Sequence, residues 1–128
     1  MTRRAVSTTS APPAAGPYSQ AITTDDLVFC AGQLGADPAT SQLAEGVQAQ
    51  TEQVMRNLQA VLDAAGCTFA DVVKTTCFLA DINDFAAFNE VYVRFVSDPA
   101  PARSTFQVAA LPRGGLVEIE AIAVRSRP

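Results

Sequence analysis

The chain has 128 residues, 48% hydrophobic and 17% charged, so it is long enough for one globular domain and too apolar to be disordered. A net charge of −4 and nine scattered basic residues disfavour a nucleic-acid partner. The absence of histidine excludes a Ser-His or Cys-His nucleophile pair and a histidine-bound metal. Three cysteines without a C-x-x-C spacing favour a reducing compartment, and no apolar run is long enough for a membrane span. We therefore expect a cytoplasmic protein without a metal or cofactor.

The first half of the chain predicts a hairpin followed by a long helix. Residues 1–15 are rich in Ser, Thr, Ala and Pro and are expected to be flexible. Residues 18–23 and 27–33 predict two strands joined by a tight turn. Residues 47–65 carry apolar side chains at helical spacing, and Gly66 is well placed to end that helix.

The second half predicts a strand, a helix and two further strands. The first strand covers residues 72–80, and Asp81 or Asp84 can cap the helix after it. That helix carries an apolar stripe, which comprises Phe85, Phe88, Val91, Tyr92 and Phe95. Two prolines end the helix, a strand follows at residues 103–109, and the last strand covers 117–124.

The element order β-β-α-β-α-β-β predicts an α+β fold in a single domain over residues 1–128. Two helical crossovers place both helices on one face of a mixed sheet, so the other face is uncovered within one subunit.

The last strand has one apolar face and one mixed face. Side chains alternate along a strand, so Glu118 and Glu120 share a face with Ile122 and Val124. A face that is half aliphatic and half acidic indicates a subunit interface, a site, or both.

Arg103 is the second candidate for chemistry. Alternation places it with Thr105 and Gln107, opposite Phe106. If the strand at 103–109 neighbours the last strand, the arginine and both glutamates share a face. An enclosed arginine needs an anion, which is either one of these glutamates in a structural salt bridge or a bound ligand.

From residue 16 onward the chain resembles the Rid family, the YjgF-like reactive-intermediate deaminases. The matching stretches are G-P-Y-S-Q (16–20), A-G-Q (31–33), A-A-G (64–66), V-K-T-T (73–76), D-I-N-D-F (81–85), N-E-V-Y (89–92), P-A-R-S (101–104) and E-I-E-A-I-A (118–123). The resemblance implies a chorismate-mutase-like fold and a homotrimer, in which three sheets face the centre and clefts lie between neighbouring subunits.

The resemblance also implies an activity. It is the hydrolysis of small enamines and imines, such as 2-aminoacrylate or 2-iminopropionate, to a 2-keto acid and ammonia, as in a 2-iminobutanoate/2-iminopropanoate deaminase. The imines would come from enzymes that use pyridoxal phosphate. The alternatives are a non-catalytic trimer that binds small carboxylates, a chaperone-like accessory protein, and a pathway-specific imine hydrolase. RNA cleavage, also attached to the family, is disfavoured by the acidic balance and the missing histidine.

The family pattern assigns roles to individual residues. Arg103 would bind the substrate carboxylate through its planar fork. Glu120 would position and deprotonate a water, although Glu118, ~7 Å away on the same strand face, is an open alternative. Backbone groups near Gly32 could hold substrate or water, and Tyr18 would close the cleft from the adjacent subunit.

Three further positions complete the predicted site. Asn89 is expected to support it from the second helix. Thr105 stands where many members of the family have cysteine, and Ala31 where many have serine. These two departures place the usual substrate in question more than the fold. The cysteines Cys30, Cys67 and Cys77 are expected to be buried, unreactive thiols.

Overall fold

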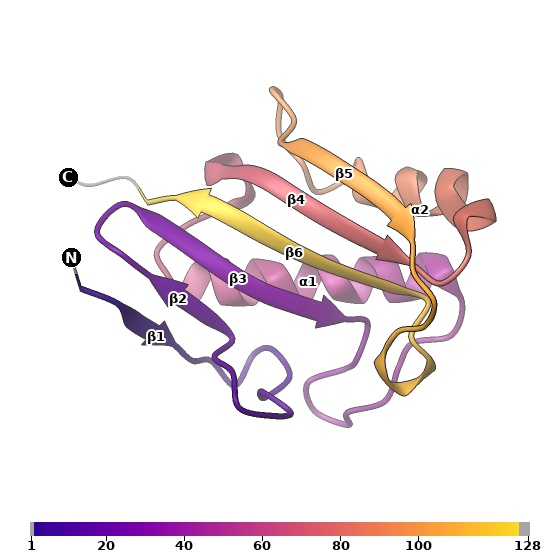
Figure 1. Ribbon diagram of the computed structural model, residues 1–128, viewed down its shortest axis with the longest axis horizontal. Coiled ribbons are helices and arrows are strands. Elements are labelled where there is room, and N and C mark those ends of the chain that lie inside the picture. Colours follow the sequence, from indigo (N-terminus) through magenta and orange to yellow (C-terminus); the bar gives the residue numbers. More distant parts are fainter. Residues whose placement is uncertain (1, 126–128) are drawn as a thin grey trace.

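A computed structural model describes residues 2–125 and shows, within them, two helices on one face of a six-stranded mixed sheet (Figure 1). Residue 1 and residues 126–128, which the one-domain prediction also covered, lie outside the described residues. The main elements are β1 (Arg4–Val6), β2 (Ala21–Thr23), β3 (Leu27–Leu34), α1 (Val47–Ala64), β4 (Val72–Leu79), α2 (Phe85–Tyr92), β5 (Ala102–Gln107) and β6 (Val117–Val124). Short 3-10 helices occupy Phe69–Asp71, Ile82–Asp84 and Pro112–Gly114. The predicted α+β architecture is confirmed.

The strand order is β1-β2-β3-β6-β4-β5. All neighbouring pairs are antiparallel except β4 and β5, which are parallel. The suggested pairing of the strand at 103–109 with the last strand is therefore wrong. The β4-α2-β5 crossover places β5 at the sheet edge beside β4, and β6 then returns to the centre between β3 and β4.

One strand was not expected. β1 pairs with β2 in antiparallel register, so part of the segment predicted to be flexible is hydrogen-bonded into the sheet. The side chain of Gln20 holds the next part of this segment. Its Nε2 donates to the carbonyls of Thr8 and Pro12 at 3.1 and 2.7 Å, and its Oε1 accepts from the Thr8 amide at 2.8 Å.

The helix α1 ends as the sequence predicted. Gly66 has a positive φ of 81°, which glycine adopts without strain. The Cys67 amide donates to the Leu62 carbonyl and the Gly66 amide to that of Asp63, which is a Schellman motif.

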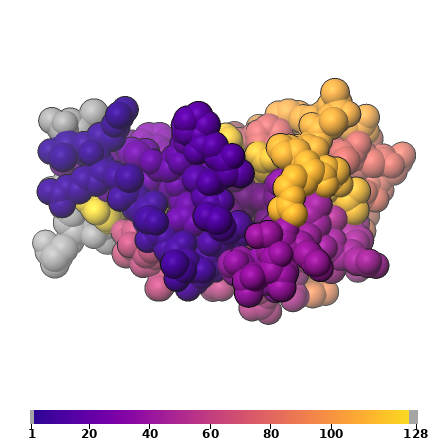
Figure 2. All heavy atoms as spheres, turned by 90° about the horizontal axis from the view of Figure 1, so that it is seen from below, coloured from indigo at the N-terminus to yellow at the C-terminus, as the bar shows by residue number. Residues whose placement is uncertain are grey.

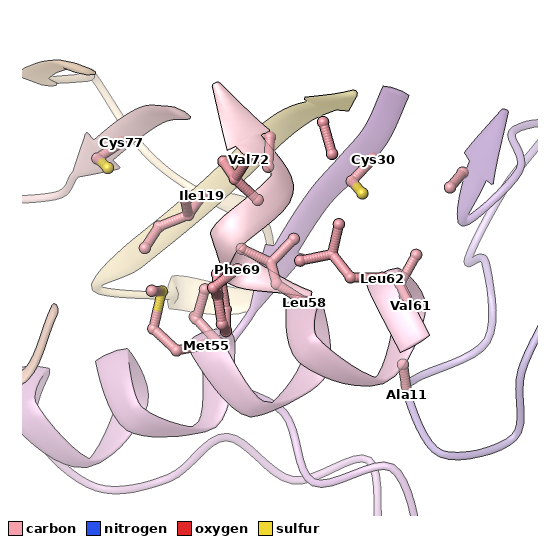
Figure 3. Packing of buried hydrophobic residues seen from close by; sticks show 14 of the residues in the cluster. Ala11, Cys30, Met55, Leu58, Val61, Leu62, Phe69, Val72, Cys77 and Ile119 are labelled. Carbon is pink, nitrogen blue, oxygen red and sulfur yellow. The ribbon is translucent and has the colours of Figure 1, made fainter. Parts of the chain in front are cut away.

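The core lies between α1 and the sheet (Figure 3). Met55, Leu58 and Leu62 of α1 are fully buried and face the strands. From the central strand, Val117, Ile119, Ala121 and Ala123 point toward the helices and are buried, as alternation predicted. All three cysteines are buried free thiols, and burial raises the pKa of Cys30 to about 12. The expectation of unreactive thiols is consistent with this geometry.

Neither helix covers the opposite face of the sheet, which faces the viewer in Figure 1. Phe29, Phe106 and Val124 are each more than 40% exposed there. The rings of Phe106 and Phe78 make an edge contact at 5.3 Å on the same face. An apolar, unpacked face of this kind indicates a surface that another molecule covers.

Candidate active site

Strand register places Arg103 on the helix-covered side of the sheet. Arg103 lies opposite Thr75 of β4, and Thr105 lies opposite Cys77. Both β4 residues are buried toward the helices. The prediction that Arg103 and Thr105 share a face with the glutamates is wrong, because Phe106 and not Arg103 lies on the glutamates' face of the sheet.

The other residues of β5 explain the misassignment. Phe106 was expected in the core, but β5 is an edge strand and Phe106 lies opposite Phe78 on the uncovered face. Glu118 lies opposite Phe78 and Glu120 opposite Thr76 on the same face. Arg103 and the glutamates of one chain are thus separated by the sheet, so a structural salt bridge between them within the chain is excluded.

Arg103 lies half-buried between β5 and α2. Its Nη1 donates to Asn89 Oδ1 at 2.8 Å. Its guanidinium carbon lies 4.8 Å from the ring centre of Tyr92, 5.4 Å from that of Phe88 and 5.5 Å from that of Phe85. Three aromatic rings and one amide therefore surround the cation.

This arginine has no acidic partner in residues 2–125. The one salt bridge in that part of the chain joins Arg56 to Glu52 on the surface of α1. A guanidinium carries five N–H donors, and the neutral Asn89 oxygen accepts from one nitrogen. The remaining donors are available to an anion from outside the chain.

Thr105 lies two residues from Arg103 on the same side of β5. Its hydroxyl is buried beside Cys77 and finds no hydrogen-bond partner of normal geometry in the described chain. Burial raises the pKa of Cys77 to about 11, and the nearby Arg103 charge partly offsets that rise. The Cys77 thiol is protonated at neutral pH, so the polar groups here are a neutral thiol and a hydroxyl without a hydrogen-bond partner of normal geometry.

A pocket of about 470 Å³ holds the second group of candidate residues. Tyr18, Gly32 and Glu118 line it, together with Ala31 and Arg113. Figure 2 shows its rim, where the indigo N-terminal segment and the orange loop before β6 stand on either side of a depression. Its remaining lining is mostly apolar and includes Pro12, Pro13, Leu34 and Ala36.

Glu118 and Gly32 are in close contact in this pocket. A methyl group on Gly32 would collide with the Glu118 carboxylate, so the glycine leaves room for the acid. Burial, and secondarily the neighbouring Glu120, raise the pKa of Glu118 above its ordinary value. Glu120 is exposed and does not line the pocket. Within one chain, Glu118 and not Glu120 therefore lines this pocket.

Tyr18 stands at the mouth of the pocket with 51% of its surface exposed. Its hydroxyl accepts from the Ala15 amide at 3.1 Å, which is a local contact within the N-terminal segment. The ring is free to meet a second molecule.

The predicted site residues therefore fall into two groups within one chain. Arg103, Asn89 and Thr105 lie together between β5 and α2, and Tyr18 and Gly32 lie in the pocket beside β3 and β6. Sequence reasoning missed the aromatic residues around Arg103, because it assigned them to a core stripe. The i, i+4 spacing of Phe85 with Asn89, and of Phe88 with Tyr92, was the available signal.

Two features of residues 2–125 bear on other classes of protein. No group of three or more His, Cys, Asp or Glu side chains among residues 2–125 is placed to hold a metal ion. In the same part of the chain, neither helix has both the length and the apolar character that a bilayer crossing requires.

Fold and site together define a small α+β protein with an uncovered apolar sheet face and a half-buried arginine that has no acidic partner among residues 2–125. The sequence model of the family described as Endoribonuclease L-PSP matches residues 8–125, and the chain belongs to this family, which includes the proteins called RidA. It is 53% identical over 126 residues to the 2-iminobutanoate/2-iminopropanoate deaminase of Capra hircus, covering 98% of this chain and 92% of the relative.

Solved structures agree with this assignment. The crystal structure of RidA from a Psychrobacter species superposes with a TM-score of 0.93 at 50% identity, covering 94% of this chain and 98% of that one. The structure of E. coli TdcF with bound serine gives a TM-score of 0.92 at 41% identity, covering 96% and 99%.

Proposed function

We propose that the protein hydrolyses small 2-imino acids, R–C(=NH)–COO⁻, with one water to give the 2-keto acid R–CO–COO⁻ and ammonia. Its substrates are the short imines formed when enzymes that use pyridoxal phosphate release enamines in the cytoplasm. Relatives about half identical to this chain carry the name 2-iminobutanoate/2-iminopropanoate deaminase, which supports this chemistry.

The observation that carries the proposal is the unpaired guanidinium of Arg103. A buried or half-buried arginine normally meets a carboxylate, and this one meets an amide and three aromatic rings. The carboxylate of an imino acid supplies the missing anion and can bind two N–H donors side by side. A bound serine in the related TdcF is an amino acid with the same carboxylate group.

Glu118 is the group that we assign to the water, in place of Glu120. Glu118 lies in the pocket, where it can take a proton from water that attacks the imine carbon. That proton passes to the imine nitrogen and gives the neutral carbinolamine R–C(OH)(NH2)–COO⁻. A second transfer, from the carbinolamine hydroxyl through Glu118 to the nitrogen, then expels ammonia as the C–N bond breaks and the carbonyl forms. A raised pKa suits an acid that must accept and return a proton. No metal or organic cofactor enters this reaction.

The two groups of residues meet in this proposal through a homotrimer. Within one chain the sheet separates Arg103 from Glu118, so a complete site needs Arg103 from one subunit and the pocket of another. The apolar uncovered face supplies the contact surface for such an assembly. Tyr18, exposed at the pocket mouth, would then close the cleft against the neighbouring Arg103, Asn89 and Thr105.

The pocket wall suits imines with short apolar side chains. Ala31 contributes a methyl group, and three prolines and a leucine continue the apolar surface. We therefore expect 2-iminobutanoate to be accepted at least as well as 2-iminopropanoate, because its additional methylene is buried favourably.

A coupled assay tests the proposal. Threonine dehydratase generates 2-iminobutanoate in the cuvette, and formation of 2-oxobutanoate is followed with and without this protein. Arg103→Lys keeps the charge but loses the fork, and we expect it to lower kcat/KM by about 100-fold. Glu118→Gln should lower kcat by about 100-fold, whereas the matched variant Glu120→Gln should retain most activity.

The outcomes separate the alternatives. No acceleration by the folded wild-type protein contradicts the enzyme proposal. If 2-oxobutanoate still binds in an Arg103-dependent way in that case, the protein is a carboxylate-binding accessory instead. Equal loss of activity in Glu118→Gln and Glu120→Gln would contradict the assignment of the water to Glu118.

A further inference from the structure

The contacts of Arg103 differ from those of an arginine in a structural salt bridge, because none of them is with a carboxylate. The hydrogen-bond acceptor that fixes its direction is a neutral amide, and the contacts that stabilise its charge are aromatic faces. Neither kind of contact neutralises the cation. The positive charge of Arg103 therefore remains available to a substrate anion.

Helix α2 supplies all four contacts from one face. Phe85 and Asn89 are four residues apart, as are Phe88 and Tyr92, so both pairs project toward β5. The guanidinium carbon lies within 5.5 Å of each of the three ring centres. Cation–π contacts at such distances stabilise a half-buried cation and leave its N–H donors unused.

A buried hydrogen bond fixes the nearest of these rings. The hydroxyl groups of Tyr92 and Thr75 lie 2.7 Å apart, and both residues are almost completely buried. Thr75 is the β4 residue opposite Arg103 in the strand register. The pair therefore ties α2 to the sheet at the level of the arginine and sets the ring plane against which the guanidinium rests.

The amide of Asn89 is suited to its task because it is neutral. Its Oδ1 accepts one N–H at 2.8 Å and so orients the guanidinium plane. An aspartate at this position would make a stronger, charge-assisted bond and would occupy the fork that a substrate carboxylate needs. An amide therefore orients Arg103 and leaves its other N–H donors free, whereas an acid would occupy them.

We propose that Asn89 and Tyr92 are positioning residues that hold Arg103 oriented and un-neutralised, so that its fork is reserved for the substrate carboxylate. This inference rests on the proposed function of the site. It identifies Tyr92 as a functional residue that the sequence placed in the hydrophobic stripe of the second helix.

The substitution Asn89→Asp separates this role from a merely structural one. A structural hydrogen bond would survive or strengthen with aspartate, and activity would persist. If the N–H donors of Arg103 must stay free for the substrate, the new carboxylate at this position would instead bind them and compete with the substrate. We expect KM for 2-iminobutanoate and the inhibition constant of 2-oxobutanoate each to rise at least about 10-fold, with kcat and the melting temperature nearly unchanged.

Two variants serve as matched controls. Asn83→Asp makes the same chemical change at an exposed position before α2 and should leave all constants unchanged. Tyr92→Phe keeps the ring but removes its bond to Thr75, and we expect a rise in KM of about 3-fold to 10-fold with little change in kcat. It also tests the inference if Asn89→Asp fails to fold.

The inference and the proposed function fail in different ways. If the wild type does not accelerate imine hydrolysis, the proposed function is wrong and the inference falls with it. If the wild type is active and Asn89→Asp binds 2-oxobutanoate within 2-fold of it, the fork is not reserved and the inference alone is wrong. A fall in stability of Tyr92→Phe without any change in KM would likewise limit that residue to packing.

Discussion

At the scale of single residues, the proposed site depends on two side chains whose surroundings are unusual for their charge. Arg103 is a half-buried cation without a carboxylate, and Glu118 is a half-buried acid without a cation. Each is unfavourable for the isolated chain, because a charge loses hydration without gaining a partner. Such pairs of mismatched groups are characteristic of sites that act on a ligand.

Because the pKa of Glu118 is raised in the folded chain, the free energy of unfolding should depend on pH. The folded chain binds this proton more tightly than the unfolded chain, whose carboxyl has the ordinary value near 4.5. The stabilisation is complete below that value and is lost as pH rises through the folded pKa. We therefore expect Glu118→Gln to unfold at higher urea concentration than the wild type at pH 7, with the difference shrinking toward pH 4.

The control for this measurement is Glu45→Gln, a change at an exposed position away from the pocket. It should shift the urea midpoint little at any pH. A midpoint for Glu118→Gln that stays below that of the wild type across the whole range would mean that the carboxylate is stabilised in the folded protein, contrary to the account.

The sequence supplied candidate residues for the site but not their arrangement in space. Arg103, Tyr18, Gly32 and Asn89 were selected from the family pattern, and the structure places each beside another predicted residue or beside Glu118. Which glutamate enters the pocket could not be predicted by alternation, since both lie on one face of β6. The choice depends on the close approach of β3 at Gly32, which is a tertiary contact.

At the scale of elements, Gln20 connects the N-terminal segment to the sheet. It is buried and bonds with Thr8 through both its oxygen and its nitrogen. It also donates to the carbonyls of Ala11 and Pro12. This segment forms one wall of the pocket, so its attachment shapes the proposed site.

The substitution Gln20→Leu should detach this wall. We expect a loss of stability of about 1–3 kcal/mol, because several backbone groups lose their partner. Hydrogen exchange provides the specific readout, since the Thr8 amide donates to Gln20 and should lose its protection. Gln59→Leu, at an exposed position on α1, is the control. Retained protection at Thr8 would show that the segment is held by other contacts.

Elements with strong local signals were predicted well, and pairing between distant strands was not. The helix α1, its glycine end at Gly66 and the apolar face of β6 follow from local periodicity and capping. The position of β5 depends on how the crossover through α2 packs, which no local pattern encodes. Arg103 was placed on the wrong face for a related reason: Phe106 was assigned to the core, but on this edge strand it lies on the uncovered face.

At the scale of the whole molecule, the uncovered sheet face is the main unsatisfied surface. Phe29, Phe106 and Val124 are exposed on this one face, on the strands β3, β5 and β6, and neither helix covers them. If three sheets pack around a centre, this surface is removed from water and contributes favourably to assembly.

A charge on this face should prevent assembly. We expect the wild type to have a mass of about 40 kDa in light scattering, three times the 13.4 kDa of one chain. Phe106→Asp should yield the monomer and abolish activity, because a buried charge without a partner opposes association. Val93→Asp, an equally drastic change at an exposed site after α2, should leave the trimer intact. A monomeric wild type would contradict the assembly.

Complementation between two inactive variants tests the central claim most directly. Arg103→Ala and Glu118→Gln chains are unfolded together in equal amounts, refolded, and assayed with 2-iminobutanoate. If each site takes Arg103 from one subunit and Glu118 from its neighbour, random mixing leaves about one quarter of the sites intact, so about one quarter of wild-type activity should return. If both groups act from the same chain, no intact site can form, and a mixture as inactive as its components would contradict the account.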